Sequence, residues 1–259
     1  MNFNIEKFDS ISQLEAALKR PLNEAWRQCT PASERMESDW NGVDTFEQAF
    51  SLFKYGDKDL ARKVSRVNVP NFSNDLPKRQ RVNGMVGGRV VVPRYLANIP
   101  TCRTRIKKVP TQSKMLTIVY NSGVNCGTNI NTIMTVSKKI VDLINSLTIA
   151  GYTCRLYLLI MTEKLGKVKV FKYLVKDFNT EFNLARTSFI LAHPAMLRGV
   201  WFKYMEHSTG NMSGFEHGYG RPYYPSKQEL LNKKVIEQTD VYTDFQELRS
   251  MKNASDIIK

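Results

Sequence analysis

The residues of this chain best suited to chemistry are cations concentrated between positions 62 and 114. This segment holds thirteen Lys and Arg against one acid, Asp75, whereas the whole chain has 38 Lys and Arg against 24 Asp and Glu. Such a concentration of positive charge is typical of a surface that binds a polyanion. The side chains expected to pair with phosphates are Arg79, Arg81, Arg89, Arg94, Arg103, Arg105, Lys107 and Lys108.

Aromatic residues accompany these cations. Tyr95 and Phe72 lie within the basic segment, and further tyrosines lie in a glycine-rich stretch from 208 to 225. Bases of single-stranded nucleic acids stack on aromatic rings while nearby cations contact the backbone, so the combination favours a nucleic-acid interface. A solvated basic loop without a ligand is the simpler alternative. The candidates outside the basic segment are Tyr219, Arg221 and Tyr223, with Tyr224 beside them.

The polar loop 121–129 is the first place to look for metal or phosphate chemistry. It is expected to follow a parallel strand, the usual position of ligands in open α/β sheets. The loop contains no aspartate or glutamate, and a divalent cation prefers carboxylate oxygens. Neither GxxxxGK[ST] nor GxGxxG is present. We expect no metal and no cofactor here, and Thr128 is predicted to cap the next helix.

A nucleophilic or metal site is also hard to assemble from cysteine and histidine. Cys126 is predicted near a helix N-terminus, but no base stands beside it in the sequence. His193 precedes a proline in an apolar segment, which favours a structural role. His207 and His217 each follow a glutamate, at a spacing that matches no zinc motif. The four cysteines form no CxxC pair, so reduced thiols are expected, and we predict no catalytic activity.

The elements that position these residues are clearest between 115 and 176. An apolar run at 115–120 predicts a strand, and apolar residues at helical spacing from 130 to 147 predict a helix that Gly151 ends. A second strand is predicted at 152–160. This order is a βαβ unit with parallel strands. A hairpin turn at 161–166 and a strand at 168–176 should follow.

The other elements have weaker signals. Residues 3–29 are predicted to be helical, with an interruption at Pro21, and Thr45 with Gln48 forms a capping box before an aromatic helix. Further predictions are a strand at 88–93, an irregular basic connector at 99–108 and a helix at 181–191. For the last thirty residues, the sequence predicts one weak helix and a polar tail.

Together these patterns predict an α/β fold whose sheet has at least one βαβ unit and an added β-hairpin. The charge divides the chain into an acidic helical region, 1–61, and a basic extended stretch, 62–114. An α/β core at 115–207 and an aromatic, glycine-rich loop with a C-terminal helix or tail at 208–259 complete the division. No apolar window long enough for a membrane span and no secretory signal are seen, so a cytoplasmic protein is expected.

Several of these motifs resemble an uncharacterised family of phage and plasmid proteins. The resemblance implies a viral origin, the host cytoplasm and a domain similar to the von Willebrand A type, with no established activity. The loop 121–129 stands where A-type domains carry a metal-binding Asp-x-Ser-x-Ser, whose aspartate is missing here. The motifs are Trp40-Asn41-Gly42, Phe46-Glu47-Gln48-Ala49, Val92-Pro93-Arg94-Tyr95-Leu96, the strand and helix 115–147, and Ala192-His193-Pro194-Ala195-Met196-Leu197-Arg198.

A weaker similarity, of size and basicity only, is to phage single-stranded-DNA-binding cofactors of viral RNA polymerase. The sequence therefore leaves two functions open. One is a nucleic-acid-binding phage protein, with single-stranded DNA favoured, that serves viral transcription or replication beside a viral RNA polymerase or replication protein. The other is a protein-interaction module of A-type fold that binds an acidic partner without catalysis. Neither requires a membrane.

Overall fold

The fold comes from a computed structural model that describes residues 1–27, 30–64, 79–108, 115–125, 127–149, 151–215 and 218–251. For residues 79–82, 105–108 and 149 the description covers the backbone. Cys29, Phe72, Cys126 and His217 lie outside the described residues. No helix among the described residues is long and apolar enough to cross a membrane.

The predicted βαβ unit is confirmed. β5 (Met115–Asn121) and β6 (Thr153–Lys164) pair in parallel, and α6 (Ile130–Ile149) connects them. The helix ends at Gly151, whose φ of 86° lies in the left-handed region that glycine adopts at low cost. Ile140 and Ile144 of α6 have no exposed surface, so the predicted apolar face of the helix packs on the sheet.

The predicted hairpin is also confirmed, with a shorter turn. β6 runs on through Lys164, and β7 (Lys167–Lys176) returns antiparallel to it. Only Leu165 and Gly166 separate the strands, with φ of 52° and 74°. Positive φ at both central residues is the geometry that suits the right-handed twist of a two-residue hairpin.

Two edge strands depart from the predictions for the chain ends. β1 (Asn2–Phe8) pairs in parallel with β7, whereas a helix was predicted from residue 3; α1 (Ile11–Leu18) begins only at the Ser10 cap. β9 (Val241–Asp244) pairs in parallel with β5, whereas only a helix and a tail were predicted. The sheet order is β1-β7-β6-β5-β9. The core therefore extends beyond the predicted 115–207 segment to both ends of the chain.

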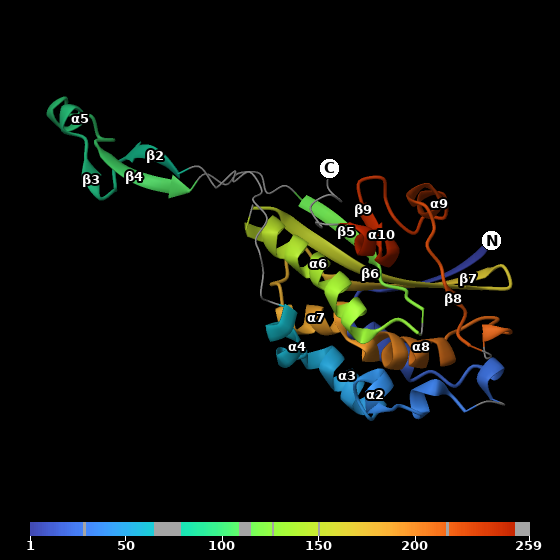
Figure 1. Cartoon of the computed structure of the whole chain (residues 1–259). Helices are drawn as coiled ribbons and strands as arrows, with labels where there is room; N and C mark the ends of the chain where they lie inside the picture. Colours follow the sequence, from blue (N-terminus) through green and yellow to red (C-terminus); the bar gives the residue numbers. More distant parts are fainter. Residues whose placement is uncertain are drawn as a thin grey trace.

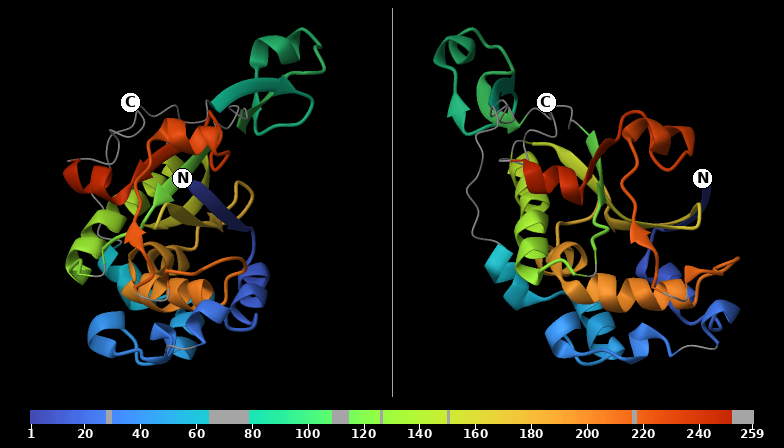
Figure 2. Two further views of the ribbon diagram at one scale, coloured as in Figure 1. Left: turned by 90° about the vertical axis from the view of Figure 1, so that its right-hand side faces the viewer. Right: turned by 45° about the vertical axis from the view of Figure 1, so that its right-hand side comes forward.

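Helices cover both faces of this mostly parallel sheet (Figure 1). Side chains of β5 and β6 alternate between two apolar clusters, with Ile118 and Leu156 in one and Val119 and Tyr157 in the other. The larger cluster lies under α6, α7 (Leu184–Ala192) and the N-terminal helices, which Figures 1 and 2 show gathered on one side of the sheet. The smaller lies under α9 (Lys227–Asn232).

The helical layer contains several short segments and one π-helical segment. Thr45 caps its α3, where both hydrogen bonds of the predicted capping box are present. Besides α1 and α6, its members are η1 (Glu24–Trp26), η2 (Ala32–Glu34), α2 (Ser38–Asn41), α3 (Phe46–Tyr55), α4 (Lys58–Val64), α7, the π-helical η3 (Met196–Trp201) and α8 (Phe202–Glu206). Close to the sheet lie β8 (Arg221–Pro222), which pairs with β6, and α10 (Phe245–Ser250).

Residues 79–108 form a separate small sheet. β2 (Arg79–Gly84), β4 (Arg103–Lys108) and β3 (Arg89–Val90) pair antiparallel in that order, and α5 (Val92–Leu96) follows β3. The predicted connector at 99–108 is thus mostly strand, and the predicted strand at 88–93 is shorter and turns into a helix. Figures 1 and 2 show this unit, here called the arm, standing away from the main sheet.

Candidate nucleic-acid interface

The arm displays its cations along an antiparallel ladder. Arg79 pairs with Lys108, and Arg105 pairs with Val82. Because alternate residues of a strand lie on the same face, Arg103, Arg105 and Lys107 occupy one face of β4 at intervals of about 6.8 Å. The register places the remaining strand cations on the opposite face, namely Arg79, Arg81, Lys108 and Arg89. Between residues 79 and 108 there is no Asp or Glu.

The described cations of the arm differ in their surroundings. Arg89 and Arg103 are exposed, and Arg103 donates one long hydrogen bond, 3.4 Å, to the carbonyl of Gly87. Arg94 is half-buried and donates to the hydroxyl of Thr101 at 3.2 Å. Arg94 therefore fixes α5 to the segment before β4. We assign it a structural role within the arm, in addition to its predicted role in pairing with phosphates.

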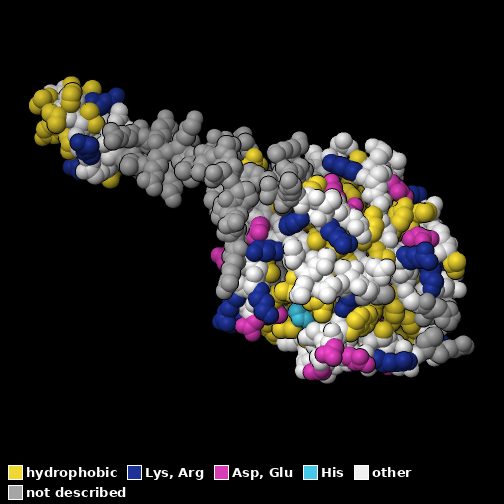
Figure 3. Space-filling model, viewed as in Figure 1, with side chains coloured by type: hydrophobic (Ala, Val, Ile, Leu, Met, Phe, Trp, Pro, Cys, Tyr) yellow, Lys and Arg dark blue, Asp and Glu magenta, His cyan; other side chains and the backbone are white. Residues whose placement is uncertain are grey.

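An apolar surface caps the far end of the arm. Tyr95 is 62% exposed and Leu96 is 75% exposed. Figure 3 shows hydrophobic side chains gathered at this end, with Lys or Arg beside them. An apolar surface of this kind on a folded protein marks an interaction site. We call it the apolar tip, and its members are Met85, Val86, Val90, Val92, Tyr95, Leu96 and Ile99.

The predicted site residues near the C-terminus are not brought together with the arm. The ring of Tyr219 stacks on Phe202 at 4.0 Å between centroids, and its hydroxyl donates to Glu206 at 2.5 Å. Tyr223 donates to Glu229 at 2.8 Å. Burial raises the pKa of Tyr219, and it raises the pKa of Tyr223 to about 12. Both tyrosines are engaged on the body, so the structure does not bring these two predicted residues together with Tyr95 in one stacking surface.

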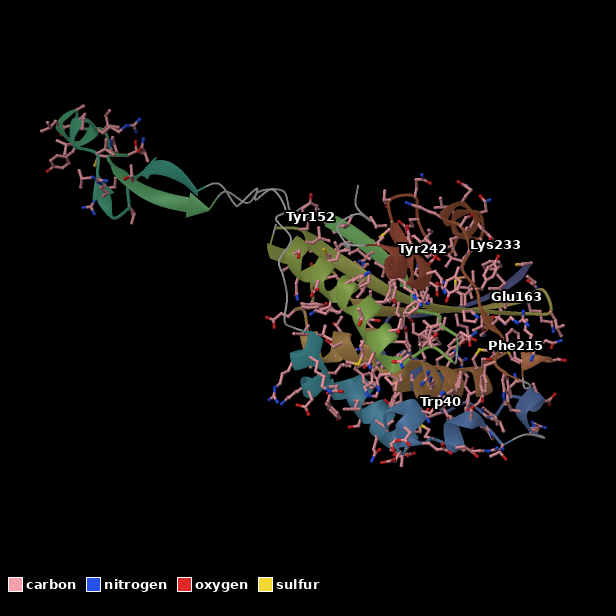
Figure 4. All side chains as sticks on the ribbon, viewed as in Figure 1. Trp40, Tyr152, Glu163, Phe215, Lys233 and Tyr242 are labelled. Carbon is pink, nitrogen blue, oxygen red and sulfur yellow. The ribbon has the colours of Figure 1, made fainter. Side chains whose placement is uncertain are left out.

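Arg221 and Tyr224 also lie on the body of the protein. Arg221 is exposed on β8, opposite Glu163 of β6, and Tyr224 donates to the carbonyl of Gly123 at 2.6 Å. Figure 4 places Glu163 and Phe215 on the side of the body away from the arm. The glycine-rich stretch therefore packs against the C-terminal end of β5 instead of extending the basic surface.

Two of the motifs noted in the sequence meet in space around Arg198. Its guanidinium donates to the carbonyl of Trp40 and, at 3.1 Å, to the carbonyl of Thr128, and it lies 4.7 Å from the centre of the Trp40 ring. Gly42 has a φ of 76°, and a Cβ there would lie 2.9 Å from Cε1 of His193. The motifs at 40–42 and 192–198 thus form one packed unit. Figure 4 labels Trp40 on the helical side of the body.

A comparison with protein families gives a match over nearly the whole chain. A family described as a domain of unknown function, DUF7192, matches residues 2–258. The chain belongs to the DUF7192 family. The match covers the main sheet and the arm together, in agreement with the resemblance to an uncharacterised family. No curated protein and no solved structure matches the chain significantly.

In the loop 121–129 of this DUF7192 domain, the side chains of Asn121 and Asn129 form hydrogen bonds with the backbone. Asn121 is fully buried; its amide donates to the carbonyl of Tyr223 at 2.8 Å, and its Oδ1 accepts from the backbone of Gly123. Asn129 caps α6 by accepting from the N–H of Asn131 at 2.8 Å, so the prediction of Thr128 as cap is wrong by one residue. The described residues contain no cluster of three His, Cys, Asp or Glu that could hold a metal.

His193, His207 and Cys154 of the DUF7192 domain have partners within the fold. His193 stacks on Phe189 at 4.8 Å, and its Nδ1 accepts from the N–H of Ala195 at 3.0 Å. The ring of His207 contacts the carbonyl of Arg20 through Nδ1. Burial raises the pKa of the Cys154 thiol to about 11, which keeps it protonated at neutral pH.

His193 leads to a pH prediction. Burial lowers its pKa from 6.5 to about 4, so the unfolded chain binds a proton in this interval while the folded chain does not. The free energy of unfolding should therefore fall as pH drops from about 6.5 to about 4, by up to about 3 kcal/mol from this group. Urea titrations at several pH values measure the effect. His193→Asn retains an acceptor for Ala195 and should lose this pH dependence; an unchanged profile would contradict the assignment.

Proposed function

We propose that the chain binds nucleic acid through the arm, with single-stranded DNA the favoured ligand. The observation that carries this proposal is the arm itself: eight Lys and Arg and no Asp or Glu, from residue 79 to 108, on a small sheet that stands away from the body. None of the described arginines of the arm forms an ion pair with a described carboxylate. Their charge is thus available to phosphates.

The geometry supports a single strand over a duplex. Cations at alternate positions of β4 would follow an extended sugar-phosphate backbone, and the exposed ring of Tyr95 would stack on a base. In a duplex the faces of the bases are covered by neighbouring base pairs, so Tyr95 and the aliphatic side chains beside it would make fewer contacts with bases than in a single strand. The proposal retains the resemblance to phage proteins with an A-type fold, and with it a role in viral transcription or replication.

Tyr95 supplies the test of base stacking. Tyr95→Ala should weaken binding of a single-stranded oligonucleotide by about 5- to 150-fold, because a stacked base contributes about 1–3 kcal/mol. Fluorescence anisotropy with a labelled oligonucleotide measures this affinity. Tyr55→Ala is the matched control, since Tyr55 is 76% exposed but lies on α3 of the body. Equal affinities of the two variants would contradict stacking at Tyr95.

The apolar tip favours a second candidate, docking of the arm on an acidic protein. An interface with an apolar centre and a charged rim matches the arrangement of the apolar tip beside arm cations. Capture of partners by the immobilised chain, after nuclease treatment, separates the two candidates. A partner that binds without nucleic acid and is lost in Leu96→Asp would support docking, whereas partners lost on nuclease treatment would support the first proposal.

A further inference from the structure

The apolar tip of the arm is an exposed hydrophobic surface with cations beside it. Met85 is 72% exposed and Leu96 is 75% exposed. The hydrophobic residues of the tip are interleaved in the sequence with Arg89 and Arg103, both exposed, and Arg103 pairs with Val90 across the ladder. A hydrophobic patch bordered by cations fits a partner that offers apolar side chains surrounded by carboxylates.

The body of the same chain carries such a surface on its N-terminal helices. Residues 34–47 hold five Asp and Glu against one base, Arg35. All five acids are exposed, and none forms an ion pair with a described Lys or Arg. Three of them stand in the first turns of η2, α2 and α3, where a carboxylate stabilises the helix. We call these residues the acidic surface, and its members are Glu34, Glu37, Asp39, Asp44 and Glu47.

An open groove of about 290 Å³ lies within the acidic surface. Met36 and Phe46, both half-buried, form its apolar part. A cavity of about 150 Å³ holds benzene, so the groove has room for two side chains of the size of leucine or methionine. Lys203 is the one base among the described residues that line it, and its Nζ lies 5.5 Å from the centre of the Phe46 ring. Three acids border the groove, namely Glu34, Asp44 and Glu47.

We infer that the apolar tip of one copy of this chain docks on the acidic surface of a second copy. The inference rests on the second candidate function, docking of the arm on an acidic protein, and identifies that protein as the chain itself. Figures 1 and 2 place the arm and α2 at opposite ends of the molecule, and Figure 3 shows Asp and Glu side chains at the lower edge of the body, where Figure 1 places α2 and α3. One copy can therefore offer its arm to one neighbour and its acidic surface to another, a head-to-tail contact between two different surfaces.

Sedimentation velocity of the whole chain, freed of nucleic acid by nuclease treatment and ion exchange, tests the inference. The mean mass should rise between about 1 µM and about 0.3 mM, the range of weak protein–protein contacts. Raising the salt from about 0.05 M to about 0.5 M should weaken association by about tenfold or more, because screening reduces the attraction between arm cations and exposed acids.

A chain that stays monomeric at every concentration would overturn the inference. One that stays monomeric but sediments with phosphatidylserine vesicles would also overturn it and would assign the apolar tip to a membrane. Binding of an oligonucleotide is measured separately by fluorescence anisotropy on the same preparation. Failure of self-association is therefore distinguishable from failure of nucleic-acid binding by the arm.

Two variants, each lacking one of the two surfaces, assign the contact. Leu96→Asp places a carboxylate on the apolar tip, and a triple variant removes the three charges that border the groove. Each variant alone should stay monomeric. An equimolar mixture should form a heterodimer, because the first variant retains the acidic surface and the second retains the tip. A mixture that stays monomeric, or a variant that associates as the native chain does, would overturn the inference. The triple variant is Glu34→Gln, Asp44→Asn and Glu47→Gln.

Matched substitutions elsewhere on the body are the controls. Leu165→Asp matches Leu96→Asp, since Leu165 is 78% exposed in the turn between β6 and β7. A control triple variant replaces three exposed acids that do not line the groove, and both controls should associate as the native chain does. Losses in the controls equal to those in the test variants would overturn the assignment to the tip and the acidic surface. The control triple variant is Glu181→Gln, Glu237→Gln and Glu247→Gln.

Discussion

Replacing Arg103, Arg105 and Lys107 with glutamine should weaken binding of single-stranded DNA by about 50-fold at 0.15 M salt. Each phosphate contact on a single strand contributes about 0.7 to the salt exponent, or about fourfold in affinity at this salt relative to 1 M. The three residues stand at alternate positions of β4 and so occupy one face of the arm. Fluorescence anisotropy of a labelled oligonucleotide measures the loss.

A second triple variant tests whether the loss is specific to one face of the arm. The triple replacement of Arg79, Arg81 and Arg89 removes the same charge from the opposite face, where the cations come from two strands. It should cost less than about tenfold, because these positions do not line one continuous track along a strand.

A third triple variant, on the body of the protein, is the control for the loss of net charge. Lys227, Lys233 and Lys234 are exposed lysines of the body that lie far from the arm in sequence, and their replacement with glutamine lowers the net charge by the same amount. Affinity should change by less than about threefold, since only long-range attraction is lost. A loss equal to that of the β4 triple would show that net charge, and not the arm, determines binding.

Lys169→Met should destabilise the fold by about 3 kcal/mol, the cost of separating a buried ion pair. Lys169 is 1% exposed, and its Nζ lies 2.6 Å from Glu6 and 5.3 Å from the centre of the Tyr204 ring. The pair joins β1 to β7, so its loss weakens the edge of the sheet. Urea denaturation followed by circular dichroism measures the change.

The stabilisation that the Glu6–Lys169 pair gives to the fold should decrease as the pH is lowered. Burial favours a raised pKa for Glu6, but hydrogen bonds and charges from Lys169 and Arg20 outweigh it and lower the pKa below 4.5. The stabilisation from Glu6 is therefore present above about pH 4.5 and is lost as pH falls through the lowered pKa. Lys169→Met should reduce this dependence.

Lys7→Met is the control for the buried pair. Lys7 is exposed on the same strand as Glu6 and pairs with Asp9 at 3.0 Å, so its removal should cost less than about 1 kcal/mol. Replacing both Glu6 and Lys169 with methionine should recover part of the stability lost in Lys169→Met, because no carboxylate is left buried, whereas Arg20, 2.8 Å from Glu6, loses its partner. Equal losses in Lys7→Met and Lys169→Met would contradict the role of the buried pair.

The sequence predicts the centre of this fold better than its edges, for a physical reason. The β5-α6-β6 unit and the hairpin to β7 are local, and their periodicity and turn residues determine them. The strands β1 and β9 pair with partners far along the chain, such as Ile5 with Val170 and Ile118 with Val241. β4 carries cations in place of an apolar alternation, so its strand pairing has no hydrophobic signal.

The candidate sites follow the same rule. The cations of the arm are recognisable because they are neighbours in sequence, although their arrangement on two faces depends on the register of β2 with β4. Trp40 and Arg198 come into contact only after folding. The available signal was the pair of motifs at 40–42 and 192–198, which pack together around Arg198. Tyr219 is a residue that the sequence suggests for the interface but that packs within the body, on Phe202 and Glu206.

The salt dependence of binding, measured on the native chain, the β4 triple variant and the body control together, tests the central proposal most directly. With four to five phosphate contacts, three of them from β4, the plot of log affinity against log salt should have a slope of about −3 to −3.5 for the native chain and the control. The β4 variant should be shallower by about 2, because it loses three contacts. Equal slopes for all three proteins, or binding that salt does not affect, would contradict nucleic-acid binding by the arm.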